Sequence, residues 1–246
     1  MCKHPAQLCV TLGQGCRGRR DSVDDVLMQA PLFAALDAEA AAALRASTTV
    51  VRLGKGEVLF REGEPGENLY VVENGKIKLG TASSDGRDAL LAVIGPGEMI
   101  GELSLFDPGP RTATATALTD STMRCLGHEA LRPWLTGRPE VAEPLLRALA
   151  QRLRKTNEAM SDLVFSDVPG RVAKALIDLG ERFGVRQGDA IVVTHDMTQE
   201  ELAQLVGASR ETVNKALADF AHRGWIRLES RSVILMDVER LQRRAR

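Results

Sequence analysis

The sequence has no run of 18 consecutive apolar residues, and its first 20 residues have no apolar central region. A helix that crosses a membrane needs about 20 apolar residues, and a secretory signal needs an apolar core. We therefore expect neither a membrane span nor a membrane partner. The chain contains only four cysteines in 246 residues. In an unsecreted chain, so few cysteines favour reduced thiols and a cytoplasmic location.

Histidine is also scarce, and its four residues are scattered along the chain at His4, His128, His195 and His222. Enzymes that use covalent catalysis place a nucleophile beside a base, and metal sites gather several His, Cys, Asp or Glu ligands. The sequence shows no such pair and no such cluster. It therefore predicts neither an enzyme nor a metal site.

The net charge is low, −1 at pH 7, but the charges are unevenly distributed. Residues 207–246 contain nine Lys and Arg against five Asp and Glu. A basic carboxyl end on an acidic body is a modest sign of an anionic partner at that end. Judged by charge alone, such an excess of Lys and Arg is more often an ordinary solvent-exposed surface than a binding site.

The length suits two ordinary domains, and a hydrophobic composition of 44% supports real cores. Residues 1–22 are rich in Gly and Arg without hydrophobic periodicity, so we expect a disordered extension. One hypothesis is that Val23 is the true start, read from a non-AUG codon. We divide the rest into a β-rich domain over 23–138, a long helix over 139–166 and a carboxyl-terminal domain over 167–246.

Short runs of β-branched residues, punctuated by glycines, fill the chain from Val50 to about Leu126. Asn74–Gly75 and Asp85–Gly86 are hairpin signals. Regular turns without intervening helices predict an antiparallel barrel or jelly-roll. Helical patterns follow this region, so the fold class is α+β.

One loop between these strands, GELSLFDPGPRTATA from Gly101 to Ala115, carries an acid, a guanidinium and small hydroxyls. We expect one helical turn from Glu102 to Phe106, then a Pro/Gly loop and a strand that opens at Arg111. Free amides at a helix start and a bidentate guanidinium suit a phosphate. Glu102 would repel phosphate, so it must face another group, such as ribose hydroxyls. The alternatives are a plain connecting loop and an enzyme that hydrolyses a bound nucleotide, for which catalytic groups are missing.

A long helix with an apolar seam follows, from about Glu143 to Ser166. Pro144 is acceptable only in a first turn, so we place the helix start within two residues of it. The interpretations are a core helix of one globular unit and a parallel two-stranded dimer seam, and we favour the dimer. Polar Thr156 in the seam, with Asn157 beside it, needs a partner from a second chain or a bound ligand. The seam repeats with heptad spacing through Ala142, Leu146, Leu149, Leu153, Thr156, Met160 and Leu163.

Pro169–Gly170 breaks the helical run, starts another helix and marks the domain boundary. We expect the next helix to run from Arg171 to Phe183, and a short strand to follow from Ile191 to Thr194. Thr198 and Glu201 then form a capping box that opens a further short helix.

That short helix and a second one, from its cap Ser209 to Ala221, are joined by a tight turn at Gly207–Ala208. This is the signature of a helix-turn-helix, and WIRLESRSVILM alternates as a hairpin wing. The apolar residues that would pack the two helices together are Ala203, Leu205, Val206, Val213 and Leu217. We predict double-stranded DNA as the partner, rather than a small structural hairpin, because the second helix exposes side chains that read base edges. The predicted DNA-binding residues are Thr198, Ser209, Arg210, Glu211, Thr212, Asn214 and Lys215.

Together these residues resemble the bacterial family of cyclic-AMP receptor protein and fumarate–nitrate regulator (CRP/FNR) transcription factors. The resemblance runs from about Val23 to Arg246 and lies in GELSLFDPGPRTATA, RLRKTNEAMSDLVFSDVPGR and VGASRETVNKAL. It implies a cyclic-nucleotide-binding β-roll, a dimerisation helix and a winged helix-turn-helix in a homodimeric, allosteric regulator. It also implies cyclic AMP as the allosteric ligand, no metal, and RNA polymerase as a further partner. A kinase regulatory subunit would share the nucleotide module but not VGASRETVNKAL.

By the same resemblance, Glu102 binds the ribose 2′-hydroxyl and Arg111 binds the cyclic phosphate. The resemblance also implies a bistable long helix, whose coupling to the ligand is typically worth about 1–3 kcal/mol. Its junction with the carboxyl-terminal domain would act as a hinge at Phe165, Asp167 and Gly170. Further nucleotide contacts are implied for Gly101, Leu103 and Thr112, and contacts to the adenine amino group, one of them from the partner chain, for Thr156 and Asn157.

Departures from the family pattern keep alternatives open. The family often has Ser where this chain has Thr112 and Asn157, and a Thr after the loop arginine can favour guanine, so cyclic GMP stays an alternative ligand. Arg210 and Glu211 imply palindromic DNA sites with a TGTGA-like core. Lys215 stands where the family often places Arg, which affects the edge of that half-site.

Inside the family, the main alternative is an iron–sulfur redox or oxygen sensor. Cys125 lies at a position similar to that sensor's fourth cluster ligand, but the other cysteines, Cys2, Cys9 and Cys16, are more widely spaced than its cluster ligands. Such sensors also lack the pair formed here by an acid and an arginine in the loop. We therefore expect Cys125 to be a small buried residue at a strand end. A regulator that binds DNA independently of nucleotide is a further alternative.

Overall fold

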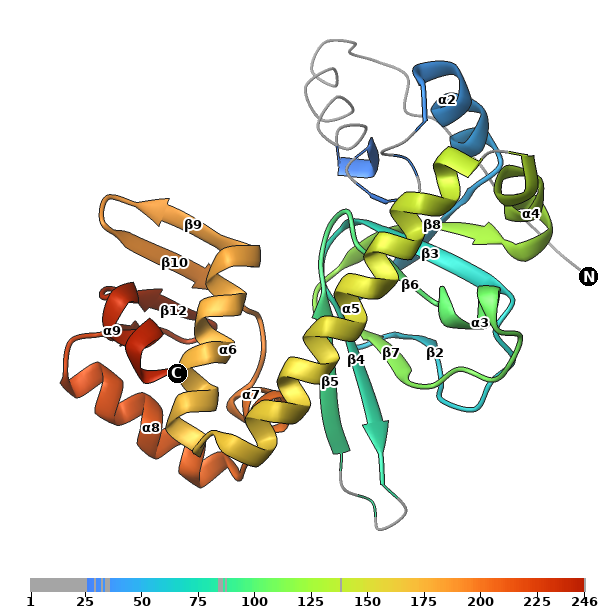
Figure 1. Cartoon of the computed structure of the whole chain (residues 1–246). Coiled ribbons are helices and arrows are strands. Elements are labelled where there is room, and N and C mark those ends of the chain that lie inside the picture. Colours follow the sequence, from blue (N-terminus) through green and yellow to red (C-terminus); the bar gives the residue numbers. More distant parts are fainter. Residues whose placement is uncertain are drawn as a thin grey trace, which may run out of the picture.

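The computed structural model describes residues 26–28, 30, 31, 33, 36–83, 86, 88–137 and 139–245. Residues 1–22, predicted to be a disordered extension, and Val23, the hypothetical start, lie outside the described residues. One long helix, α5 (Pro139–Phe165), crosses a β-roll and ends at a smaller carboxyl-terminal domain, here called the head (residues 167–245; Figure 1). Within the described residues, no helix is long and apolar enough to cross a membrane.

The described part of the β-roll contains two four-stranded antiparallel sheets, with the strand orders β1-β8-β3-β6 and β2-β7-β4-β5. Gly75 makes the turn between β3 and β4 with a φ of 90°, a left-handed conformation that Gly adopts without strain. The predicted antiparallel jelly-roll is confirmed. Its strands are β1 (Thr49–Leu53), β2 (Val58–Phe60), β3 (Asn68–Asn74), β4 (Ile77–Ala82), β5 (Asp88–Ile94), β6 (Met99–Ile100), β7 (Thr114–Ala117) and β8 (Ser121–Gly127).

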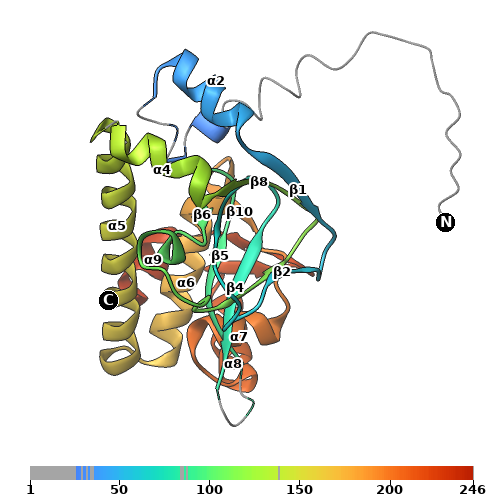
Figure 2. The same ribbon diagram turned by 90° about the vertical axis from the view of Figure 1, so that its right-hand side faces the viewer.

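The core of the β-roll continues under helices at one end of the sheets. α2 (Ala38–Ala46) and α4 (His128–Gly137) lie together at this end, beside the start of α5 (Figure 2). Asp37 caps α2, since its carboxylate accepts a hydrogen bond from the Ala40 N–H at 2.7 Å. The buried apolar residues that hold the helices to the sheet include Leu27, Phe33, Leu44, Leu69, Leu131 and Leu145.

α5 begins at Pro139, before the predicted start at Glu143, and it ends at Phe165. The prediction that Pro144 marks the start is wrong, because Pro144 lies within the helix, where its missing N–H removes one backbone hydrogen bond. The 27 residues span about 40 Å. The seam side chains are open to solvent, with exposed fractions of 65% for Leu146, 62% for Leu153 and 63% for Met160. The seam is therefore not a core face of the single chain, and the core-helix interpretation is wrong.

The head folds around α6 and a small sheet with the strand order β11-β12-β10-β9. Its core contains buried residues from every helix of the head, including Leu176, Leu202, Val213 and Leu241. The elements of the head are α6 (Val168–Phe183), β9 (Gly184–Gln187), β10 (Ala190–Thr194), α7 (Gln199–Val206), α8 (Arg210–His222), β11 (Ile226–Leu228), β12 (Ser232–Leu235) and α9 (Val238–Arg244).

Three features of the head differ from the sequence predictions. α6 begins at Val168 rather than Arg171, because Asp167 caps it and accepts a hydrogen bond from the Gly170 N–H at 2.9 Å. Proline is well suited to such a first turn, so Pro169 lies inside the new helix, and the predicted break between the two helices is confirmed. β9 and α9 were not predicted, since both are short and mostly polar.

His195 lies between β10 and α7 and is 7% exposed. Its Nδ1 accepts a hydrogen bond from the Met197 N–H at 3.1 Å, so this nitrogen carries no proton. Burial lowers the pKa of His195, and the Lys76 ammonium acts in the same direction, whereas the carboxylates of Asp196 and Glu201 oppose it. The unfolded chain therefore takes up this proton at a higher pH than the folded chain does.

We expect the free energy of unfolding to fall as the pH drops below about 6.5, the ordinary pKa of histidine, because protonation of His195 then favours the unfolded chain. His195→Gln should flatten this dependence. His222→Gln, at an exposed position of α8, is the control substitution. Urea unfolding between about pH 5 and 8 measures all three proteins. An unaltered slope in His195→Gln would contradict the assignment.

Candidate functional site

The loop between β6 and β7 places two buried charged residues in the β-roll. Glu102 is 3% exposed and Arg111 is 5% exposed. Glu102 precedes α3 (Leu103–Phe106), which is the helical turn predicted from the sequence. Gly101 has a φ of 84°, and a Cβ there would lie 2.5 Å from Nη1 of Arg111. Glycine at this position thus leaves room for the guanidinium.

Arg111 is held by backbone carbonyls and an aromatic ring. Nη2 donates to the Asn68 carbonyl at 2.8 Å, and Nη1 donates to the Gly101 carbonyl at 3.2 Å. The guanidinium carbon lies 4.3 Å from the centre of the Phe60 ring. Nε is buried and has no hydrogen-bond partner among the residues that the structure describes. A buried cation whose partners among the described residues are all neutral is an electrostatic site for an anion.

Glu102 contacts the long helix instead. Its Oε1 accepts a hydrogen bond from Nη1 of Arg152 on α5, while Oε2 is buried without a partner among the described residues. The sequence interpretation missed Arg152, for which the available signal was its position one helical turn before Thr156. The expectation that Glu102 faces ribose hydroxyls stays a prediction.

Both side chains line one small cavity of about 40 Å³, which has room for only a few water molecules. Arg152 lines it from α5, whereas Thr156 and Asn157 do not line it and are exposed on the helix. The Thr156 hydroxyl donates to the Arg152 carbonyl at 3.0 Å. The predicted nucleotide residues that the fold brings together around the cavity are Gly101, Glu102, Leu103, Arg111 and Thr112.

α7 and α8 form the predicted helix-turn-helix. The capping box is present, since the Thr198 hydroxyl accepts from the Glu201 N–H at 3.1 Å and the Glu201 carboxylate accepts from the Thr198 N–H at 2.8 Å. Gly207 makes the turn with a φ of 68°, and the Ser209 side chain caps α8. Of the apolar residues predicted to join the two helices, one is half-buried, Leu205, and the others are buried, Ala203, Val206, Val213 and Leu217.

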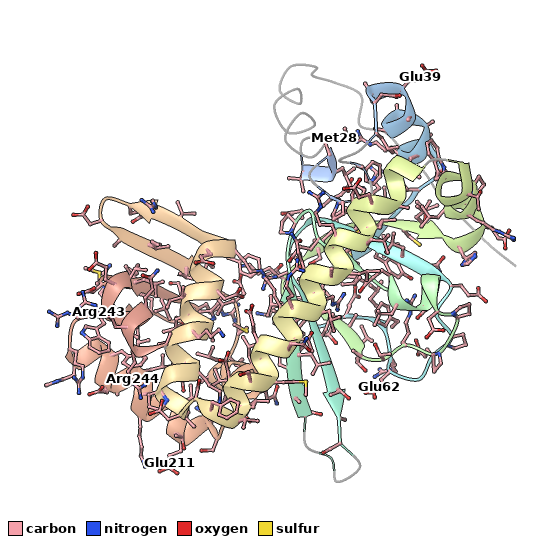
Figure 3. The ribbon with its side chains drawn as sticks, in the orientation of Figure 1. Met28, Glu39, Glu62, Glu211, Arg243 and Arg244 are labelled. Carbon is pink, nitrogen blue, oxygen red and sulfur yellow. The ribbon has the colours of Figure 1, made fainter. Side chains whose placement is uncertain are left out.

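The outer face of α8 carries most of the predicted DNA-binding side chains. Glu211 projects outward at the lower edge of the head (Figure 3), and it forms an ion pair with Lys215 at 2.8 Å. Asn214 differs, because it is half-buried and its Nδ2 donates to Gln199 Oε1 on α7 at 3.2 Å. The exposed members of the predicted set are Thr198, Ser209, Arg210, Glu211, Thr212 and Lys215.

The predicted hinge residues lie where α5 meets α6. Phe165 ends α5 and is 85% exposed. Asp167 lies 2.5 Å from Nη2 of Arg244 in α9. The hydrogen bonds from Arg244 and from the Gly170 N–H lower the pKa of Asp167. The ion pair between Asp167 and Arg244 therefore connects the start of the head to α9, its last helix.

Arg171 adds a second connection at this junction, which was not predicted. Its Nη1 donates to the Ser166 carbonyl at 2.7 Å, just after α5. Its Nε and Nη2 donate to the carbonyls of Val206 and Gly207, at 3.0 and 3.2 Å. One guanidinium thus joins the end of the long helix to the turn of the helix-turn-helix.

Two family models match this chain. The cyclic nucleotide-binding domain covers residues 50–136, and the Crp-like helix-turn-helix domain covers residues 170–244. A CRP-like cAMP-activated global transcriptional regulator of Mycobacterium tuberculosis (strain ATCC 25618 / H37Rv) is 56% identical over 224 residues, which are 91% of this chain and all of that protein. The chain belongs to the CRP/FNR family of transcription regulators.

Other CRP/FNR-family proteins are similar over most of the chain. The cyclic AMP receptor protein of Thermus thermophilus is 37% identical over 71% of this chain and 77% of its own. The structure of FixK2 from Bradyrhizobium japonicum covers 80% of this chain and 96% of its own, with a TM-score of 0.71 and 25% identity. The predicted β-roll and winged helix-turn-helix are confirmed, and the protein is a DNA-binding regulator with a cyclic nucleotide-binding domain, not an enzyme.

Cys125 lies in the middle of β8 and is half-buried, so its predicted place at a strand end is wrong. The other cysteines of this CRP/FNR-family chain fall outside the described residues. In the part of the chain that the structure describes, no three His, Cys, Asp or Glu side chains gather as a metal site. The iron–sulfur alternative depends on those other cysteines and stays a prediction.

Arg152→Ala should destabilise this CRP/FNR-family protein by about 1–3 kcal/mol, because the buried carboxylate of Glu102 loses its partner. The loss is smaller than for a fully buried pair, since the Arg152 side chain is 39% exposed. Arg147→Ala is the control on the same helix, and it breaks an exposed pair with Glu143 worth less than about 0.5 kcal/mol. Urea unfolding measures both variants, and equal losses would contradict the role given to Glu102.

Proposed function

We propose that this protein is a homodimeric transcription regulator that binds cyclic AMP in its β-roll and TGTGA-like palindromic DNA through its two heads. The observation that carries the proposal is the pocket with two buried, oppositely charged side chains, each of which has one atom without a partner in the part of the chain that the structure describes. A cyclic nucleotide offers an anionic phosphate and ribose hydroxyls to these two side chains. We assign residues 23–138 to ligand binding, 139–166 to dimerisation and 167–246 to DNA binding.

In this proposal Arg111 binds the cyclic phosphate and Glu102 binds the ribose 2′-hydroxyl, with Gly101, Leu103 and Thr112 completing the site. A cavity of about 40 Å³ is too small for a nucleotide, so the pocket must open. The movable part is Arg152, because its side chain is 39% exposed while that of Glu102 is 4% exposed. Ribose hydroxyls would replace Arg152 as donors to Glu102, which links ligand binding to the position of α5.

The choice of cyclic AMP is supported by a relative. The Mycobacterium tuberculosis protein with 56% identity is described as cAMP-activated. The CLP regulator of Xanthomonas campestris, 27% identical with a TM-score of 0.68, is described as responsive to c-di-GMP, so a shared fold accommodates different nucleotides. Thr112 next to Arg111 keeps cyclic GMP as the alternative ligand here.

The homodimer is supported by the exposed seam of α5. A parallel two-stranded coil would bury Leu146, Leu153 and Met160 between the two copies. Thr156 and Asn157 would then lie at the dimer axis, where one chain can reach the ligand of the other. A ligand in this place would bias the arrangement of the two heads through the junction of α5 with α6.

DNA recognition is proposed for the exposed side of α8. Arg210 would donate to guanine and Glu211 would accept from cytosine, with Lys215 at the edge of the half-site. Thr198 and Ser209 cap the two helix starts, where backbone N–H groups favour phosphate. Further contacts are proposed for Thr212 and Asn214, and RNA polymerase is proposed as a protein partner at promoters.

Arg111→Ala should abolish cyclic AMP binding in isothermal titration calorimetry, because the phosphate loses its bidentate cationic partner. Size-exclusion chromatography with light scattering should still show a dimer for wild type and variant. Arg132→Ala, at an exposed position of α4, is the control and should bind as wild type does. Unchanged affinity in Arg111→Ala would refute the pocket, and a monomeric wild type would refute the dimer. Titration with cyclic GMP in parallel decides the ligand preference.

Arg210→Ala should cost about 1–3 kcal/mol of binding free energy and relax specificity at one base position. Fluorescence anisotropy with wild-type and singly substituted palindromes, at one fixed salt concentration, measures this. Arg223→Ala, just beyond the other end of α8, is the control, since that guanidinium pairs with Asp219 at 2.8 Å. A uniform loss across all duplexes would make Arg210 a phosphate contact instead.

A further inference from the structure

One exposed side-chain amide joins the two helices of the helix-turn-helix. Gln199 is the first residue of α7 and follows its cap, Thr198. Its Oε1 accepts hydrogen bonds from two side chains of α8, from Nδ2 of Asn214 at 3.2 Å and from Nη2 of Arg210 at 3.4 Å. We call these three side chains the glutamine bridge. Gln199 was not predicted to take part in DNA recognition.

The backbone that carries Gln199 is firmly held. On one side, the capping box between Thr198 and Glu201 fixes the start of α7. On the other side, Leu202 and Ala203 are 3% and 1% exposed and belong to the core of the head. The Gln199 side chain therefore extends from a rigid support, which a positioning group requires.

Arg210 and Asn214 are four residues apart on α8, so their side chains lie on the same side of the helix. The hydrogen bonds to Gln199 place this side against the start of α7. Glu211 and Lys215 are also four residues apart, but they pair with each other at 2.8 Å. The side chains predicted to read DNA thus form two groups, and the glutamine bridge connects one of them to α7.

Asn214 depends on the bridge for its orientation. Its Oδ1 is buried and has no hydrogen-bond partner among the described residues. The bond from Nδ2 to Gln199 therefore supplies the compensation that this half-buried amide receives within the described part of the chain. Loss of that bond would leave the amide desolvated without a partner, which is unfavourable.

Arg210 is held more weakly. Its bond to Gln199 is 3.4 Å long, beyond the usual length of about 2.9–3.0 Å for an N–H···O bond, so a base can replace it. A long, exposed side chain loses rotamer freedom when it binds, and this loss lowers affinity. Because Gln199 already restrains the guanidinium in the free protein, part of this loss precedes DNA binding.

We propose that Gln199 is a positioning residue for base recognition, which orients Arg210 and Asn214 through its Oε1 and makes no base contact itself. This inference rests on the proposed role of Arg210 at guanine. An oriented side chain helps only where it meets its own base. Loss of the bridge should therefore weaken binding to the preferred sequence more than binding to other sequences.

Gln199→Met tests the proposal, because methionine has a similar length and helix propensity but no acceptor oxygen. A randomised duplex pool first yields the preferred site of the wild type, so the test does not depend on a TGTGA-like half-site. Fluorescence anisotropy then compares this site, its single-base variants and a random duplex at one salt concentration. We expect the variant to lose about three- to tenfold of its preference at one base position, with unchanged affinity for the random duplex.

Two further variants separate positioning from other effects. Gln199→Glu keeps an acceptor oxygen, so it should retain the base preference, while its added negative charge weakens binding to every duplex alike. Gln204→Met makes the same replacement within α7 at a half-buried glutamine outside the bridge, and it should match the wild type.

An equal loss on every duplex in Gln199→Met would make Gln199 a phosphate contact and overturn the proposal. Unchanged binding of Gln199→Met would overturn it too. If Arg210→Ala loses the base preference while Gln199→Met keeps it, the positioning role fails and the proposed function stands. A selected site without a TGTGA-like core would refute the proposed half-site, while a lost preference in Gln199→Met would still support the positioning role.

Discussion

A buried charge is costly unless its surroundings satisfy it, and this constraint shapes the centre of the β-roll. The Arg111 guanidinium is held within the domain by two carbonyls and an aromatic ring, while its Nε has no partner among the described residues. One oxygen of the Glu102 carboxylate is satisfied from outside the domain, by Arg152 of the long helix, and the other has no partner among the described residues. Because the partner of Glu102 comes from α5, the environment of this buried carboxylate depends on the position of the helix. This dependence needs no contact between the pocket and the head.

Local patterns made most of the architecture predictable from the sequence. Glycine-punctuated short strands predicted the β-roll, and the capping box at Thr198 with the turn at Gly207 predicted the helix-turn-helix. These signals act within a few residues, so they survive without knowledge of the tertiary structure. Errors occurred where a local rule had two solutions. Pro144 was accommodated inside α5, and α6 begins at Val168 instead of at the predicted Arg171.

Contacts between distant parts of the chain were not predictable in this way. Glu102 and Arg152 are 50 residues apart, and Lys76 and Asp196 are 120 residues apart. Neither the periodicity nor the spacing of the sequence shows which of its many charged side chains will form ion pairs with one another. The same holds for Arg171, whose three carbonyl partners lie just after α5 and at the end of α7, two places that come together only in the fold. The sequence therefore predicted the parts of the site better than their connections.

Glu201 divides its two carboxylate oxygens between the two bodies of the molecule. Oε1 accepts from Lys78 of the β-roll, while Oε2 accepts from the N–H and the hydroxyl of Thr198 within the head. The cap of α7 is thus complete without any help from the β-roll. Loss of the Lys78 contact would therefore leave the start of α7 with its backbone and side-chain hydrogen bonds intact.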